Sequence, residues 1–305
     1  MARTTGLARP DEAAPDAPSA TPPRLDGVPP QPRAAAGRPG PGLEPGLEKG
    51  RAPGAAADLD PDPVAERVRA TLDGVFAAVA ATGEETAALL VRAGAGGRRP
   101  LRDDLAALRP GLHARLGGLV SGIGFVAAPG LLADVPAWLE WWQRGPDGSV
   151  RPLVRDLDPA HSAYSDYTHW DWYALPRETG LRAVAGPYVD YLCSDEYGLT
   201  LSAPVHVDGA FVGVAAADVY LRHFEAAVLP VLQELPVPAR LVNARGRVAA
   251  STDPAHLAGS LTKGPDVAAV LAAPPAVHHD RGLRLTPCHG TPLVLVTPEP
   301  ERLSR

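Results

Sequence analysis

The segment LTLSAPVHVDGAFVGVAAADVYL, residues 199–221, constrains the fold of this 305-residue chain more strongly than any other. Two apolar runs flank the dipeptide Asp208-Gly209. An Asp-Gly pair between two such runs is among the strongest short-range signals for a β-hairpin, because both residues tolerate the positive φ angles of a two-residue turn. The chain is therefore expected to contain an antiparallel sheet built around this hairpin.

Further elements are predicted on both sides of the hairpin. From about residue 59 to residue 93, apolar residues recur every three or four positions, which indicates a long amphipathic helix. Its repeating positions are Val64, Val68, Leu72, Val75, Phe76 and Val79. Other helices are expected at 101–117, 221–235 and 265–273. Strands are expected within 118–132, on both sides of the turn at 145–148, in a second hairpin at 240–252, and at 282–287 and 292–299.

This order predicts an α+β fold: a long N-terminal helix packed on an antiparallel, PAS-like sheet, with a reduced second small α+β lobe. The larger lobe is expected over 59–236 and the smaller lobe over 237–305. Residues 1–58 carry twelve prolines and little aliphatic periodicity. Such a segment cannot bury enough apolar surface to offset its ordering entropy, so it is expected to be a disordered tail. That tail serves either as a spacer or as a docking segment.

Composition excludes several classes of protein. The net charge of −6 argues against a nucleic-acid partner. Cys193 and Cys288 are too few for a disulfide framework and fit no zinc pattern, so two buried thiols or one disulfide are expected. The N-terminus lacks the apolar core of a signal peptide. No segment approaches the ~18 uncharged apolar residues of a membrane span. The expected location is therefore the cytoplasm, away from any membrane.

Aromatic and acidic residues gather between the predicted strands. Residues 161–198 hold six of the seven tyrosines and two of the five tryptophans. Residues 158–196 hold seven acidic residues against two arginines, Arg177 and Arg182. A carboxylate offsets the cost of burying an ammonium group, and each aromatic face attracts a cation by roughly 0.5–2 kcal/mol when desolvated. The local field therefore favours a cationic ligand.

These residues admit two interpretations: an aromatic lid that belongs to the core, or a cage for a cationic ligand. If the segment is extended, Trp170 and Trp172 share one face and Asp171 lies opposite. Asp218 ends an apolar strand, so it is the N-cap of the next helix, a ligand contact, or both. The predicted ligand-binding residues are Tyr164, Tyr167, Trp170, Asp171, Trp172, Tyr173, Tyr188, Asp190 and Asp218.

The sequence resembles the Cache (PDC-type, PAS-like) ligand-sensing domain in three elements. These are the long entry helix, the segments WDWYALP (170–176) and AGPYVD (185–190), and the hairpin that ends in Asp218 before a helix. The segment at 239–259 is also similar to the start of the smaller lobe of double-Cache domains. The resemblance covers roughly residues 60–300 and implies a long helix packed on antiparallel PAS-like sheets, with a ligand in the larger lobe.

In the amino-acid-binding members of that family, an Arg and a Tyr hold the ligand carboxylate and an Asp holds the ammonium group. Trp172 and Tyr173 match the family's Trp-Tyr pair, and Asp218 matches the distal Asp. Trp170 occupies the position of the family Arg, and Ser165 that of the first Tyr. The resemblance thus implies that the ammonium end is kept and that the carboxylate clamp is missing, unless Arg177 or Arg182 enters the pocket.

The resulting expectation is a small-molecule sensor module, not an enzyme, that recognises a compact amine or amino-acid-like ligand. No cofactor and no metal site are expected: His278, His279, Asp280, Cys288 and His289 have metal-ligand chemistry but not the paired spacing of a site. A homodimer through the entry helix and an unknown signalling partner are further expectations. The alternatives are an interaction protein whose tail docks a partner, and an enzyme that uses Asp171, Asp190 or Asp218 as general acid or base.

Overall fold

The computed structural model describes residues 61–145, 147–157, 161, 166–189, 196–273 and 276–299. The predicted tail at 1–58 lies outside this range, so the expectation of disorder there stays a prediction. The division into lobes at about residue 237 also stays a prediction. The described part contains two antiparallel sheets, one on each side of that position in the sequence.

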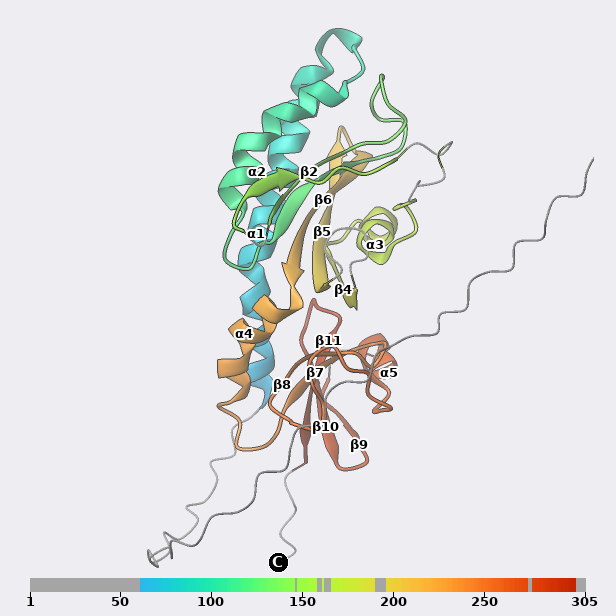
Figure 1. Ribbon diagram of the computed structural model, residues 1–305. Coiled ribbons are helices and arrows are strands. Elements are labelled where there is room, and N and C mark those ends of the chain that lie inside the picture. The colour runs from blue at the N-terminus through green and yellow to red at the C-terminus, as the bar shows by residue number, and fades with distance from the viewer. Residues whose placement is uncertain are drawn as a thin grey trace, which may run out of the picture. The chain divides into compact units, whose positions relative to one another are not determined.

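The helix α1, Pro61–Ala93, confirms the long N-terminal helix that the periodicity predicted. Its apolar stripe, which includes Val68, Leu72 and Val79, is buried in the main hydrophobic core. On the polar side, Arg69 bonds both Glu66 and Asp73 one turn away on either side. Figure 1 shows α1 running along both sheets, so this single helix packs against each of them.

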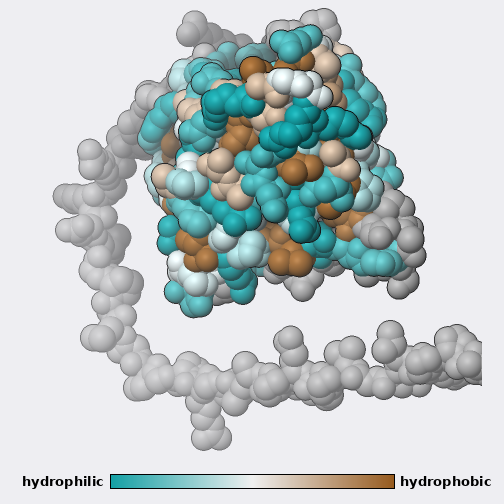
Figure 2. Space-filling view, turned by 90° about the horizontal axis from the view of Figure 1, so that it is seen from above, coloured by the Kyte–Doolittle hydropathy of each residue, from teal (hydrophilic) through white to brown (hydrophobic). Residues whose placement is uncertain are grey.

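Among the described helices, α1 alone is long and apolar enough to cross a membrane, judged by length and composition. The sequence prediction did not anticipate this, because it required an uninterrupted run of uncharged residues. Burial of the apolar stripe against the two sheets accounts for the composition, as it does for any core helix. In Figure 2, which views the molecule from above, hydrophobic residues are interspersed with hydrophilic ones over the surface.

The larger sheet has six strands in the order β3-β2-β1-β6-β5-β4. Its centre is the predicted hairpin, β5 (Tyr197–Val207) and β6 (Ala210–Tyr220), which turns at Asp208 and Gly209 with φ angles of 50° and 79°. The other strands are β1 (Gly122–Ala127), β2 (Leu139–Arg144), β3 (Val150–Pro152) and β4 (Ala183–Val189). The last of these contains Gly186 and Pro187 and was not predicted as a strand.

The smaller sheet has five strands in the order β8-β7-β11-β10-β9. They are β7 (Arg240–Asn243), β8 (Val248–Ser251), β9 (His278–Asp280), β10 (Leu283–Pro287) and β11 (Leu293–Pro298). The helix α4, Leu221–Leu232, connects the two sheets, and α5, Val267–Ala272, packs on the smaller one. The antiparallel α+β architecture is thus as predicted.

Short helices complete the fold. They are η1 (Ala95–Gly97), η2 (Arg102–Leu108), α2 (Arg109–Arg115) and α3 (Asp171–Thr179). The predicted helical stretch at 101–117 corresponds to η2 and α2. The extended conformation considered for residues 170–173 is wrong, because Trp170 is the N-cap of α3 and the following residues are helical. The two-residue alternation of a strand therefore does not apply to residues 170–173 and does not decide which of their side chains share a face.

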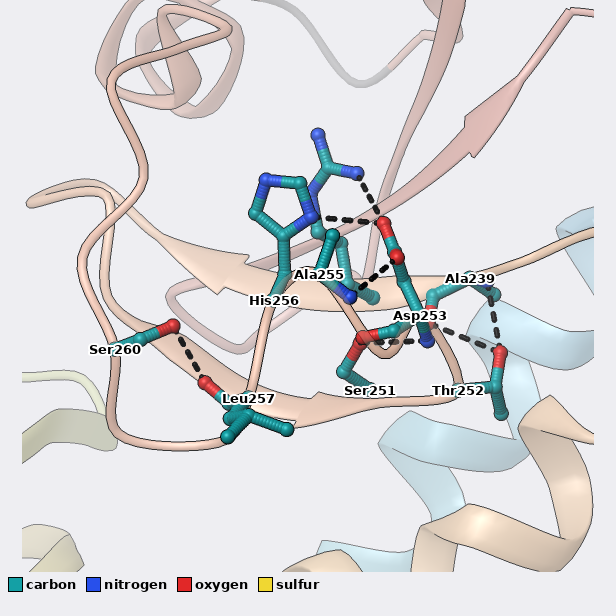
Figure 3. Close-up of polar contacts among 9 residues, drawn as sticks. Ala239, Ser251, Thr252, Asp253, Ala255, His256, Leu257 and Ser260 are labelled. Atoms are coloured by element: carbon teal, nitrogen blue, oxygen red, sulfur yellow. Dashed lines mark hydrogen bonds and ion pairs between the residues drawn. The ribbon is translucent and has the colours of Figure 1, made fainter. Parts of the chain in front are cut away.

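The polar loop after β8 is held by one carboxylate in the smaller sheet (Figure 3). Asp253 accepts a hydrogen bond from the Ala255 amide at 2.9 Å and lies 2.8 Å from His256 Nδ1 and 3.5 Å from the Arg240 guanidinium. The Ala255 amide and the His256 side chain hold the pKa of Asp253 below its ordinary value. Since these contacts are all internal, this cluster stabilises the loop and offers little to a ligand.

Different elements pack against the two faces of the six-stranded sheet. Because side chains alternate along β6, Ala215, Ala217 and Val219 face the core formed with α1. Val214 and Ala216 face the other way, toward Tyr173 of α3. This division places the aromatic stretch and α1 on opposite faces of the same sheet.

Close packing of β1 against β2 gives a prediction about stability. An added Cβ at Gly124 would lie 2.8 Å from Trp141 Cα and would clash with the Glu140 carbonyl oxygen. Gly124→Ala is therefore expected to lower the free energy of unfolding by about 1–3 kcal/mol. Gly74→Ala is the control, because Gly74 lies within α1 with nothing within 4 Å of an added Cβ. It should raise the free energy of unfolding by about 0.5–1 kcal/mol. Urea denaturation measures both, and equal stability of the two variants would contradict the packing argument.

Candidate functional site

Small residues form the floor of the sheet face that lies toward α3. Gly122 and Gly124 of β1 pair with Asp218 and Ala216 of β6, which in turn pair with Thr200 and Ser202 of β5. The missing side chains of the glycines leave room for an indole. An added Cβ would lie 2.9 Å from Trp141 Nε1 at Gly122 and 2.9 Å from Trp141 Cε3 at Gly124. The Trp141 indole of β2 therefore lies over Gly122 and Gly124 of β1.

Asp218 lies on this same face and is the acidic end of a hydrogen-bonded chain. Thr200 Oγ1 donates to Asp218 Oδ1 at 2.7 Å, and Tyr188 Oη lies 2.5 Å from Thr200 Oγ1. A carboxylate only accepts, so the Thr200 proton is directed at Asp218 and Tyr188 must be the donor to Thr200. The Tyr188 hydroxyl therefore uses its proton on Thr200 and can act only as an acceptor toward any further partner. The chain thus extends the negative potential of Asp218 to β4.

The interpretation of Asp218 as the N-cap of the following helix is wrong. The cap residue of α4 is Tyr220, whose side chain makes no capping hydrogen bond. The Asp218 side chain is turned to Thr200 instead. An added Cβ at Gly122 would lie 3.4 Å from Asp218 Oδ2 and 2.9 Å from Trp141 Nε1, so the carboxylate and the indole N–H flank the same position on the sheet.

Three buried polar atoms on this side of the sheet have no hydrogen-bond partner among the described residues: Trp141 Nε1, Ser202 Oγ and Tyr173 Oη. Burial raises the pKa of Tyr173 to about 12. Leaving a buried donor or acceptor unpaired costs about 1–3 kcal/mol, so native structures seldom keep such atoms without a reason. These three atoms lie on the same face of the sheet as Asp218, where a bound molecule or ordered water would pair them.

A cavity of about 400 Å³ lies next to this polar face. Its volume falls within the range of small-molecule sites, which are mostly apolar with a few polar groups. It brings together four predicted site residues: Trp170, Asp171, Trp172 and Tyr188. The remaining lining comes from α3, β4, the turn after β7 and the loop before β11, namely His169, Leu175, Val184, Ala185, Gly186, Val189, Asn243, Ala244, Arg245 and Pro292.

The predicted aromatic residues divide between this cavity and the core. Trp170 meets Tyr188 edge to face, with ring centroids 6.4 Å apart. Tyr167 and Tyr173 are buried together, with centroids 5.2 Å apart, and Tyr167 Oη donates to the Ala127 carbonyl at 3.0 Å. Trp172 stacks on Tyr167 and also borders the cavity. The core interpretation is thus confirmed for Tyr167 and Tyr173, whereas for Trp170, Trp172 and Tyr188 the ligand cage stays a prediction.

Two of the predicted site residues, Tyr164 and Asp190, lie outside the described residues. Asp218, Tyr167 and Tyr173 do not line the 400 Å³ cavity, although Asp218 reaches its wall through Thr200 and Tyr188. Sequence reasoning missed Trp141, Thr200, Ser202 and Arg245. The glycines at 122 and 124 were a usable signal for Trp141, since paired glycines on a strand permit an aromatic ring on a neighbouring strand.

The arginines that the sequence suggested as carboxylate ligands lie elsewhere. Arg177 bonds Glu178 at 3.1 Å, and its guanidinium lies 5.9 Å from the Tyr173 ring. Arg182 lies over the Phe76 ring at 4.2 Å. Within the described residues, no group of three or more His, Cys, Asp or Glu side chains could hold a metal ion. Cys288 is buried as a free thiol, as predicted, and Cys193 lies outside the described residues.

A protein-family model matches the central segment of the chain. Residues 153–226 match the family model described as "Methyl-accepting chemotaxis protein-like, first PDC sensor domain". This range contains α3, β4, β5, β6 and every predicted site residue. No curated protein sequence matches the chain.

Solved structures similar to this one include sensory and ligand-binding domains. The sensory domain of the Campylobacter jejuni chemoreceptor Tlp3 has a TM-score of 0.52 at 15% identity, covering 79% of this chain and 92% of that chain. The extracellular domain of the putative histidine kinase mmHK1S-Z3 has a TM-score of 0.53 at 15% identity, with 79% and 91% covered. The ligand-binding domain of C. jejuni Tlp3 in complex with L-valine has a TM-score of 0.52 at 16% identity, again with 79% and 91% covered. The resemblance to the Cache (PDC-type) ligand-sensing family is therefore confirmed, in sequence over residues 153–226 and in fold over the described chain.

Proposed function

We propose that this protein is a small-molecule sensor module that binds a compact ammonium-bearing ligand, an amine or an amino acid, on the α3 side of the six-stranded sheet. The observation that supports this most is the chain from Asp218 through Thr200 to Tyr188, which joins a carboxylate to the wall of an aromatic cavity. The site binds its ligand without chemical change.

The charges and rings are suited to an ammonium group. Asp218 supplies the negative charge, and the Tyr188 oxygen supplies an acceptor that Thr200 orients. Trp170 and Trp172 border the cavity with aromatic faces or edges. Because the cavity also has aliphatic walls, its ligand combines one cationic group with an apolar part.

The similar structures support a sensor of this kind. The Tlp3 ligand-binding domain was solved in complex with L-valine and with L-norvaline, at TM-scores of 0.52 to this chain in both cases. At 16% and 14% identity these likenesses establish the fold only, so the ligand class for this chain rests on its own residues. The cytoplasmic location, the homodimer through α1 and the signalling partner remain predictions.

Asp218→Asn tests the carboxylate. It should weaken binding of an amine or amino acid by roughly 5-fold to 10-fold, since the relay through Thr200 and Tyr188 then ends in a neutral group, and a hydrogen bond to a charged group is worth about 1 kcal/mol more than a neutral one. Calorimetry with a panel of amines, betaines and amino acids measures the change. Asp208→Asn is the control, because Asp208 is exposed in the turn of the same hairpin at φ 50°, where Asn is well tolerated. Equal affinity of both variants for the same ligand would exclude Asp218 from the site.

Trp170→Ala tests the aromatic wall. Loss of one desolvated cation–π contact of roughly 0.5–2 kcal/mol should weaken binding about 2-fold to 30-fold. Trp138→Ala is the control, because Trp138 is also partly exposed but lines a different cavity beside β2. Ligand affinity by calorimetry and thermal unfolding are measured together. Loss of folding in Trp170→Ala with intact folding in Trp138→Ala would show that the ring belongs to the core.

A further inference from the structure

We propose that Arg245, from the turn between β7 and β8 of the smaller sheet, binds the carboxylate of the ligand, so that the ligand is a zwitterionic amino acid with an apolar side chain. This rests on the proposed function and narrows its ligand class. Of the described residues that line the 400 Å³ cavity, Arg245 is the only one whose side chain is permanently positive.

The turn that carries Arg245 is held firmly beside the larger sheet. Asn243 is buried, and its Oδ1 accepts from the Arg245 amide at 3.0 Å and from the Arg247 amide at 2.9 Å. Its Nδ2 donates to the Gly186 carbonyl of β4 at 3.0 Å. One buried amide therefore shapes the turn and attaches it to the strand that forms a cavity wall. The backbone of Arg245 is positioned at the cavity for reasons independent of any ligand.

The side chain of Arg245 is only lightly engaged. Its Nη2 donates to Asp171 Oδ2 at 3.3 Å, with the Arg245 and Asp171 side chains 76% and 59% exposed. An exposed ion pair of this kind contributes about 0–1 kcal/mol. A guanidinium has five N–H donors and suits a carboxylate that accepts two of them. A ligand carboxylate can therefore share or replace the Asp171 contact at little cost.

Asp171 also limits which acids can bind. A simple carboxylic acid would bring a second negative charge beside Asp171, which opposes binding. A zwitterion avoids this, because its ammonium group offsets the repulsion and has acidic partners at this site. Leu175, Val184, Val189 and Pro292 line the same cavity and suit an apolar side chain. The cavity thus favours a neutral amino acid over both a bare amine and a bare acid.

Matched pairs of probes separate the two ends of the ligand. L-valine is compared with isobutylamine, and L-tryptophan with tryptamine, since each amine is the amino acid without its carboxylate. Affinities for the full-length wild type and for Arg245→Gln are measured by calorimetry, with thermal unfolding as a check of the fold. Arg245→Gln should bind the amino acid about 10-fold to 100-fold more weakly and the amine within about threefold of wild type. Arg245→Lys should recover part of the loss, because it keeps the charge but not the two-pronged geometry.

Two control variants carry the same loss of charge elsewhere. Arg281→Gln removes an arginine that is 91% exposed in the turn before β10, and it should change neither affinity. Arg177→Gln removes the arginine of α3, and a selective loss of amino-acid binding in this variant would overturn the assignment to Arg245. Wild-type affinity of Arg245→Gln for both members of a pair would also overturn it, while leaving the proposed function intact. If wild type binds none of the four probes, the proposed function and this inference both fail.

Discussion

The architecture depends on the burial of one face of α1 against two separate sheets. Val68, Leu72 and Val79 are fully buried in a core that also includes residues of both sheets, such as Ala215 and Leu295. A helix of 33 residues is long enough to serve both, at about 1.5 Å per residue. Because the sheets share this helix, the turn between β7 and β8 meets β4 and α3. The cavity exists only through that meeting.

The two faces of the larger sheet differ in their chemistry. The face toward α1 is aliphatic and closely packed, as a core should be. The face toward α3 carries glycines, Ser202, Thr200 and Asp218, and it retains polar atoms without partners among the described residues. An unpaired buried polar atom weakens a fold, so the three atoms on this face are candidate partners for a ligand. Strand alternation allows both demands to be met within the same eleven-residue strands.

The polar contacts that position the cavity walls are buried, whereas the ion pair at the cavity rim is exposed and weak. Asn243 is buried and holds both the turn and β4. The Asp171–Arg245 pair at the rim is exposed and long. The Asp218–Thr200 bond is short and attached to the central hairpin. A site built this way has fixed walls, a fixed negative end and a rim whose charges can exchange partners with a ligand.

The α+β class, the long first helix and the central hairpin could be predicted from the sequence, because periodicity and the Asp208-Gly209 turn are local properties of the chain. Composition and family resemblance also marked the aromatic stretch and Asp218 as candidates for a site. Only the tertiary structure decided that Tyr167 and Tyr173 are core residues, that Trp170 begins a helix, and that Asp218 bonds Thr200 rather than capping α4. It alone brought Arg245 to Asp171, residues 74 positions apart in the chain. Contacts between distant segments depend on how the sheets pack on α1, and no local pattern in the sequence encodes that packing.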